Sequence, residues 1–319
     1  MRLLFLTLLL LTPISFAQER PGPDNTGPLV DESQLVEYTG RTRITTDGTV
    51  LEGVIINGTI NIQANNVTLR NFIIRSESHY AINIRSGTGH LFEDGLLFGP
   101  SSSGVLGSDF TARRLEVTHV GGDAFKPRRN FVIENNWIHR LGYIDGSHAD
   151  GIQMVGGDNP SEGNGIIRNN FFDMRNDQEI PGEGRNYANS QCIIIQTNNG
   201  AVDDVLIEGN WFDGAGFQIL VNERNDNGPP TNITITENIF GLEGLPHAQF
   251  GPLSLRGGEY NVFDNQFNVD LGTSANTPIG SLPPGAPGPS NPNRSTATTL
   301  VPIIELLFST QEEIEPLSE

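Results

Sequence analysis

The chain has 319 residues and a formal net charge of −19, from 38 acidic and 19 basic side chains, only one of which is a lysine. Phosphate neutralisation needs a basic surface, so this balance excludes a typical nucleic-acid binder. With 36% apolar and 18% charged residues the chain is also unlike a disordered protein. Cys192 is its only cysteine, which excludes a disulfide within the chain.

The N-terminus has the pattern of an export signal. Arg2 precedes an apolar run from Leu3 to Leu11, and Ser15-Phe16-Ala17 is a small-residue cleavage site. The run is too short to span a bilayer as a mature helix. We therefore predict a secreted protein, extracellular or periplasmic, with no membrane span. Secretion without disulfides favours a bacterial source.

Short segments that alternate β-branched and polar residues recur along the middle of the chain, as in Val132 to Ile138 and Ile166 to Phe172. Each contains Asn followed by an aromatic or aliphatic residue. With Gly95 and Arg114 counted as equivalents, the Asn position recurs from Asn71 to Asn265 at intervals of 24, 19, 22, 34, 40, 28 and 27 residues. Strand alternation at this period predicts a solenoid, because propeller blades need about 40 residues with four strands each.

We therefore predict an all-β fold: a single-stranded right-handed parallel β-helix with about nine coils. The recurrent Asn suits a tight bend, where it tolerates a left-handed backbone and can bond to neighbouring coils as a ladder. The two longest intervals indicate insertions, which become loops on one face of a solenoid.

The C-terminal part has a different composition. Residues 271–299 are rich in Gly, Pro and Ser and are typical of an extended linker. Leu300 to Phe308 is an apolar nonamer, which we expect to dock on the body, although a partner-binding tag would have the same pattern. The predicted parts are a signal peptide (1–17), an N-terminal cap segment (18–42), the β-helix (43–270), the linker (271–299) and an apolar, acidic tail (300–319).

Two motifs carry a resemblance to a known superfamily: Gly122-Asp123-Ala124-Phe125-Lys126 and Ala149-Asp150-Gly151-Ile152-Gln153. With the Asn-punctuated coils they resemble the pectate-lyase-like β-helix superfamily of secreted carbohydrate-active proteins, over roughly residues 38 to 270. The resemblance implies the fold but no single reaction, since the superfamily includes lyases, hydrolases, epimerases, esterases and non-enzymatic adhesins.

These motifs place several polar residues together. If Phe125 and Ile152 point into the core, alternation sends Lys126 and Gln153 outward, on neighbouring coils about 5 Å apart at the backbone. Lys126, the sole lysine, is the candidate general base, and Gln153 is a candidate substrate-binding residue.

Asp123 and Asp150 should stack in the same way where their strands begin, with His148 on the loop just before Asp150. A histidine beside a carboxylate can act as acid or base near neutral pH, so we count His148 and Asp150 as catalytic candidates. A structural interpretation stays open, because an Asp-Gly pair also caps turns.

Six cations lie between Arg113 and Arg140 against three acids, which makes this segment net +3 in an acidic chain. A basic groove of this kind fits an acidic polysaccharide as partner, with Arg128, Arg129 and Arg140 as carboxylate ligands. Neighbouring arginines should also favour the neutral form of Lys126. Alternatively, these cations simply pair with surrounding acids.

Two further candidates are less specific. Asp123 and Asp150 are possible calcium ligands, because hard cations need several oxygens, although no metal-loop spacing is present. Tyr143 and Tyr187 lie on predicted insertions and could stack against a sugar, which makes Tyr143 a substrate-binding candidate. No other cofactor is indicated, and we expect a monomer.

The favoured function is a polysaccharide lyase that cleaves a uronate-containing polymer by β-elimination. Lys126 would be the base, Arg128 or Arg129 would bind the carboxylate, and His148 would protonate the leaving oxygen. One alternative is a glycoside hydrolase that uses Asp123 and Asp150. Another is a non-catalytic glycan-binding or structural β-helix.

Overall fold

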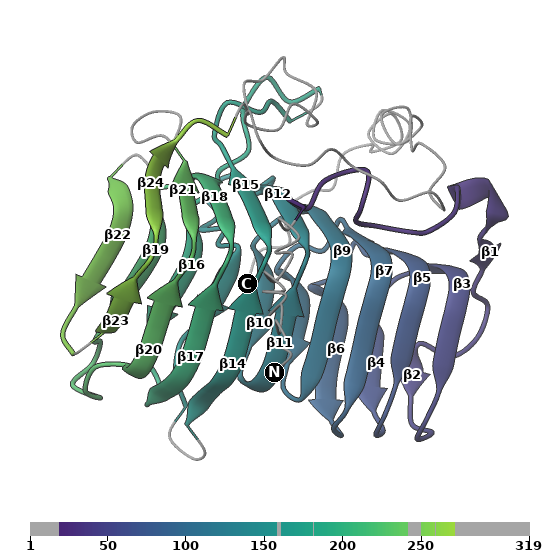
Figure 1. Cartoon of the computed structure of the whole chain (residues 1–319). Coiled ribbons are helices and arrows are strands. Elements are labelled where there is room, and N and C mark those ends of the chain that lie inside the picture. The colour runs from purple at the N-terminus through teal and green to yellow at the C-terminus, as the bar shows by residue number, and fades with distance from the viewer. Residues whose placement is uncertain (1–18, 158–160, 181, 242–249, 259, 272–319) are drawn as a thin grey trace, which may run out of the picture.

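The computed structural model describes residues 19–157, 161–180, 182–241, 250–258 and 260–271 (Figure 1). These residues form a right-handed parallel β-helix, as predicted, with one short 3-10 turn, η1 (Glu32–Gln34). The predicted signal peptide, the tail and the linker beyond Leu271 lie outside the described residues. Within the described part of the chain, no helix is long and apolar enough to cross a membrane.

One sheet supplies a single parallel strand from each of nine coils, in agreement with the predicted coil number. Its strands follow one another in chain order along the stack. They are β2 (Arg43–Ile44), β4 (Ile60–Gln63), β6 (Tyr80–Ser86), β8 (Ser103–Gly107), β10 (Asp123–Pro127), β13 (Ile152–Met154), β16 (Gln191–Gln196), β19 (Phe217–Asn222) and β22 (Gly251–Arg256).

The second sheet has fifteen strands because its later coils divide into two strands each. The early strands are long and undivided: β3 (Val50–Asn57), β5 (Thr68–Arg75), β7 (His90–Phe98) and β9 (Phe110–Val120), with β1 (Val36–Glu37) added beside β3. After β9 each coil has a first and a second strand. The first strands are β11 (Arg129–Glu134), β14 (Glu162–Arg168), β17 (Val202–Glu208), β20 (Thr231–Thr236) and β23 (Tyr260–Phe263); the second are β12 (Trp137–Leu141), β15 (Phe171–Met174), β18 (Trp211–Gly214), β21 (Ile239–Gly241) and β24 (Gln266–Val269).

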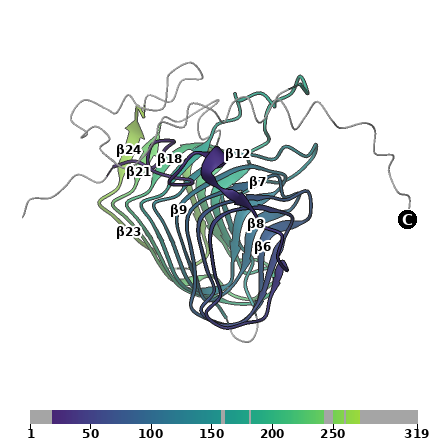
Figure 2. The ribbon, with the colours of Figure 1, turned by 90° about the vertical axis from the view of Figure 1, so that its right-hand side faces the viewer.

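Successive coils overlie one another when the molecule is viewed from the end of the stack (Figure 2). The core inside them is a column of fully buried side chains that stack from coil to coil. Phe172, Phe212 and Phe240 form one such stack, with ring centroids 5.0 and 5.1 Å apart. Cys192 is buried in β16, as its apolar neighbours predicted.

The bend in the larger sheet is formed by two adjacent residue positions. The sequence pattern predicted a single repeat position in place of the two. The first position has a left-handed backbone in every coil. Its residues are Gly53, Asn71, Asp94, Arg114, Asn135, Asn169, Gly209, Glu237 and Asp264, with φ between 50° and 68°.

The second position carries the predicted asparagine ladder, which consists of Asn136, Asn170, Asn210, Asn238 and Asn265. The Oδ1 atom of each later Asn accepts hydrogen bonds from both the backbone N–H and the Nδ2 of the preceding one, at 2.9–3.0 Å. Asn71 and Arg114 belong instead to the left-handed position. Counting them with the ladder was therefore wrong by one residue.

The outer face of the larger sheet shows where many of the cations lie. One outward position alternates Glu and Arg over seven consecutive coils, as Glu52, Arg70, Glu93, Arg113, Glu134, Arg168 and Glu208. Ion pairs of 2.6–3.0 Å join Arg70 to Glu52, Arg113 to Glu93 and Arg168 to Glu134. Alternating charges in adjacent strands favour the observed register.

The N-terminal segment runs along the outside of the stack, past β9, β7 and β5 in Figure 1. The backbone N–H of Gly27 donates to the Arg114 carbonyl and that of Leu29 to Asn71 Oδ1. Arg20 reaches the later coils: it donates to the Leu271 carbonyl at 2.8 Å and lies over the Phe171 ring. This segment therefore links early and late coils.

Candidate active site

The motif residues lie on the outer face of the nine-stranded sheet. Phe125 of β10 pairs with Ile152 of β13, and both are completely buried. The next residues, Lys126 and Gln153, are partly exposed on neighbouring coils. The structure thus brings these two side chains to one face, as strand alternation predicted.

Below them lies a second hydrogen-bonded stack, the acidic ladder of Asp123, Asp150 and Gln191. Asp123 Oδ1 accepts the Asp150 N–H at 2.8 Å, and Asp150 Oδ1 accepts the Gln191 N–H at 2.9 Å. Gln191 Oε1 in turn accepts the Phe217 N–H at 2.6 Å. Each side chain therefore satisfies a backbone donor of the next coil at the start of its strand.

The two remaining carboxylate oxygens face the outward residues. Lys126 Nζ lies 2.9 Å from Asp123 Oδ2, and Gln153 Nε2 donates weakly to Asp150 Oδ2 at 3.3 Å. The Lys126 side chain is 29% exposed, whereas that of Asp123 is 2% exposed, so the ammonium covers the buried carboxylate. The Lys126 amine is therefore held by a carboxylate, whereas a lysine free to act as the base was expected from the sequence.

Burial is the main cause of the raised pKa of both carboxyl groups. Desolvation, followed by the nearby Asp123 charge, raises the pKa of Asp150 to about 8. Desolvation also raises the pKa of Asp123, against the opposing effects of Lys126 and the Asp150 N–H. The pair therefore retains a proton at a pH where exposed aspartates are ionised, and that proton belongs to the pair rather than to one residue.

His148 is exposed on the loop between β12 and β13. Its Nδ1 lies 2.9 Å from Ser190 Oγ, and its charge acts on Asp123. Sequence reasoning missed Ser190 and Gln191. The available signal was their place one coil after Ala149 and Asp150, which the pairing of Ala149 with Asn189 now establishes.

The predicted basic groove does not form as one surface. Arg113 and Arg114 lie on β9 of the other sheet, where they pair with Glu93 and Asp94 at 2.6–2.9 Å. For these two arginines and for Lys126, the alternative interpretation, pairing with surrounding acids, is the one observed.

Arg128 and Arg129 follow β10 at the turn into β11, beyond the end of the strand that carries Lys126. Arg128 is exposed, and its charge acts on Glu162. Arg140 is the next-to-last residue of β12, and its charge acts on His119, His139 and Tyr187. None of the three has a contact with Lys126 among the described residues.

Of the tyrosines predicted to stack on a sugar, Tyr187 is buried and Tyr143 is only partly exposed, and both pack against His119. Tyr187 is 2% exposed, and its hydroxyl lies 2.8 Å from His119 Nδ1. Tyr143 stacks on the His119 ring at 4.3 Å between centroids and donates to the Gly99 carbonyl. Burial lowers the pKa of His119 to about 3, so this cluster is neutral and holds the loops in place.

The acidic ladder does not fit a calcium site. All four oxygens of Asp123 and Asp150 already accept a hydrogen bond or an ion pair from the protein. In addition, the described residues contain no group of three His, Cys, Asp or Glu side chains that could hold a metal ion. Calcium needs at least six oxygen ligands.

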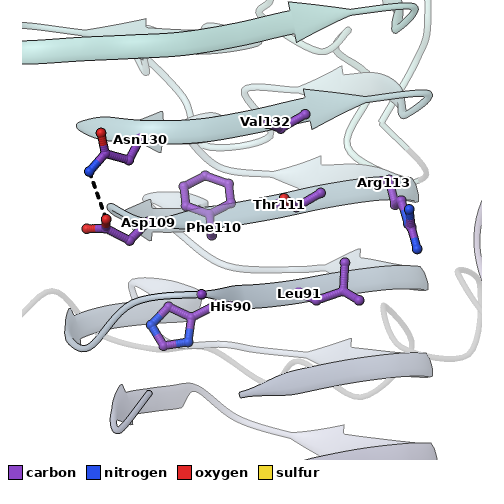
Figure 3. Close-up of a pocket in the computed structure, with 9 residues that line it drawn as sticks. His90, Leu91, Asp109, Phe110, Thr111, Arg113, Asn130 and Val132 are labelled. Carbon is purple, nitrogen blue, oxygen red and sulfur yellow. Dashed lines mark hydrogen bonds between the residues drawn. The ribbon is translucent and has the colours of Figure 1, made fainter. Parts of the chain in front are cut away.

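A separate hollow of about 460 Å³ lies on the outside of the other sheet, across β7, β9 and β11 (Figure 3). Asn130 donates to Asp109 there at 2.8 Å. His90, at its edge, is 2% exposed, and burial lowers its pKa. No residue singled out as catalytic lines this hollow, so it is distinct from the Lys126 site.

No family model and no curated protein sequence matches the chain. Among solved structures, the catalytic domain of a GH87 α-1,3-glucanase in complex with tetrasaccharides is similar, with 11% sequence identity and a TM-score of 0.36. The alignment covers 70% of this chain and 52% of that one, so the chain spans about half the length of the matched structure.

Proposed function

We propose that this β-helix is a carbohydrate-active enzyme that cleaves a uronate-containing polysaccharide by β-elimination. The observation that carries the proposal is the outward Lys126 ammonium, held by buried Asp123 at 2.9 Å, with the exposed His148 close enough to act electrostatically on the same carboxylate. A fixed cation beside an imidazole is the pair of groups that this elimination needs.

The ion pair changes the roles expected from the sequence. Because Asp123 holds the Lys126 amine, we assign Lys126 to bind the substrate's carboxylate and to stabilise the enediolate that develops there. The base is then His148, which removes the proton from the carbon next to that carboxylate. The C–O bond to the leaving sugar breaks as the double bond forms. The imidazolium can return its proton to the departing oxygen from the same face of the ring.

The buried residues position these groups and do not touch the substrate. Asp150 has no exposed surface and Asp123 is 1% exposed. Asp123 fixes the ammonium, and Ser190 fixes the imidazole ring through its 2.9 Å contact. Gln153, one coil from Lys126, is the partly exposed amide next to the site and a candidate ligand for a sugar hydroxyl.

The test is the purified protein against a panel of uronate polymers, with ultraviolet absorbance as the readout, because elimination creates an unsaturated sugar. We expect Lys126→Ala and His148→Ala each to lower kcat at least about 100-fold. Arg85→Gln, an exposed cation on β6 of the same sheet, is the matched control and should keep full activity. Unchanged activity in Lys126→Ala would remove the role assigned to the lysine.

Hydrolysis is the second candidate, because a carboxyl with a pKa of about 8 is protonated at neutral pH, as a general acid must be. Against it, neither Asp123 nor Asp150 is exposed to a sugar. The products discriminate between the two reactions. Hydrolysis leaves a new reducing end without ultraviolet absorbance, and binding without products from any polymer would favour the non-catalytic alternative.

A further inference from the structure

A second polar pocket, of about 410 Å³, lies farther along the sheet that carries Lys126. It is formed where β19 and β22 end and by the turn that follows β19. Asn222 and Arg256, which pair in the sheet register, line it together with Glu223, Arg224 and Asp226 of the turn.

The pocket offers two cations and an amide without an internal partner. The Arg224 and Arg256 side chains are exposed, and neither forms an ion pair among the described residues, where the observed pairs involve other cations. Asn222 is 8% exposed, and its Oδ1 has no hydrogen-bond partner. A buried amide oxygen without a partner is costly unless a ligand or water donates to it.

A buried threonine, Thr197, forms hydrogen bonds with both ends of the turn that carries Arg224. Thr197 Oγ1 accepts the Arg224 N–H at 2.9 Å and donates to the Gly228 carbonyl at 2.8 Å. Asn227 Nδ2 donates to the Thr197 carbonyl at 2.6 Å. Because both ends of the turn are bonded to one side chain, the pocket is formed before any ligand arrives, which lowers the cost of binding.

The pocket lies on the same sheet as the Lys126 site but two residues farther along the strands, because Gln153 pairs with Ile194 and Ile194 pairs with Leu220, two residues before Asn222. From the Gln153 strand, β13, the sheet continues through β16 and β19 to β22. At about 4.8 Å per coil, the pocket begins about 10 Å from β13 and ends about 14 Å from it. The offset of two residues adds about 7 Å along the strands, so a polymer that crosses the sheet obliquely from Lys126 can place a later sugar residue in this pocket.

We propose that this pocket is a subsite for an acidic sugar residue, in which Arg224 and Arg256 bind the carboxylate and Asn222 binds a hydroxyl group. The inference rests on the proposed function for the identity of the polymer. Glu223 and Asp226 favour this ligand over a phosphate or sulfate, because a sugar acid has one charge and several hydroxyl donors for the two carboxylates.

The test is calorimetric titration with oligomers of galacturonic, glucuronic and guluronic acid, and with the same oligomers after reduction of their carboxyl groups. We expect Arg224→Gln and Arg256→Gln each to weaken binding of an acidic oligomer about 10- to 100-fold. Reduction of the oligomer should have a similar effect on the wild-type protein. Arg41→Gln, an exposed arginine at the other end of the stack, is the matched control and should bind normally.

The outcomes separate this proposal from the proposed reaction. If the arginine variants lose affinity while no polymer is cleaved, the pocket stands and the lyase function fails. If the wild-type protein cleaves a polymer and both variants keep its Kd and KM, the pocket assignment is wrong and the reaction stands. Equal affinity for acidic and reduced oligomers, or no binding of any oligomer, also overturns the assignment.

Discussion

The asparagine ladder and the acidic ladder both join neighbouring coils, but the first uses neutral amides and the second uses two carboxyl groups. In both, a buried side chain in one coil bonds to the backbone of a neighbouring coil, which joins the coils at a bend or at a strand start. The asparagine ladder repeats one neutral residue over five coils. The acidic ladder extends over three coils and contains two carboxyl groups where an amide would serve as well.

This difference indicates which ladder serves the site. A repeated amide is fully paired, because each Asn donates and accepts within the stack. A carboxylate accepts but does not donate, so each Asp leaves an oxygen that needs a cation or an amide above it. Lys126 and Gln153 fill that need at the surface. The acidic ladder therefore differs from the neutral asparagine ladder at the place where the candidate catalytic residues lie. There the same carboxyl groups affect both the stability of the fold and the proposed reaction.

Breaking the asparagine ladder should have the largest effect on stability. In Asn170→Ala the Asn136 N–H and the Ile133 carbonyl both lose a buried partner. We expect the free energy of unfolding to fall by about 3–5 kcal/mol, measured by urea denaturation. Asn186→Ala removes an exposed side-chain hydrogen bond of similar length, to the Asn176 carbonyl, and should cost less than about 1 kcal/mol. Equal losses in the two variants would contradict a special role for the buried ladder.

The acidic ladder should instead make stability depend on pH. The pKa of Asp150 is about 8 in the folded protein and near 3.8 when unfolded, so the folded state holds the proton more tightly. That contribution is complete below about pH 4 and is lost as the pH rises towards 8. Asp150→Asn should therefore be more stable than the wild-type protein at pH 8 by on the order of 2 kcal/mol, and the advantage should vanish at low pH.

The comparison requires unfolding free energies of both proteins across this pH range. Asp145→Asn, which changes an exposed carboxylate on the loop that also carries His148, is the control and should follow the wild-type curve. A constant difference between Asp150→Asn and the wild-type protein at all pH values would show that the proton is not held at this ladder.

The coils and the position of the asparagine ladder could be predicted from the sequence, because the same short pattern recurs in successive coils. The Asn-aromatic repeat located Asn136, Asn170, Asn210, Asn238 and Asn265 correctly, since all five precede a residue of the stacked second strands. In the early coils the strands do not divide. There Asn71 and Arg114 occupy the left-handed position, which tolerates several residue types. The repeat position was therefore assigned one residue too early in these coils.

The pairing of charges was much harder to predict, because it depends on which residues meet between coils. Lys126 and Gln153 could be placed together by counting 27 residues. The same segment suggested one basic groove, yet Arg113 meets Glu93 only through the register of β7 and β9. Ser190 reaches His148 from the next coil, 42 residues later, and the insertion within that coil makes the pairing hard to find by counting.

The smallest predicted effect tests the link between the acidic ladder and the imidazole above it. Ser190→Ala removes the 2.9 Å contact that orients His148 but leaves the neighbouring Asp150–Gln191 hydrogen bond intact. Stability should change by less than about 0.5 kcal/mol, because the contact is exposed. The kcat of any lyase activity should fall about tenfold without a change in KM, because the imidazole is less well oriented. Ser108→Ala, a serine at the turn before β9, should alter none of these quantities. A Ser190→Ala protein with an unchanged kcat would show that the imidazole is oriented by other contacts.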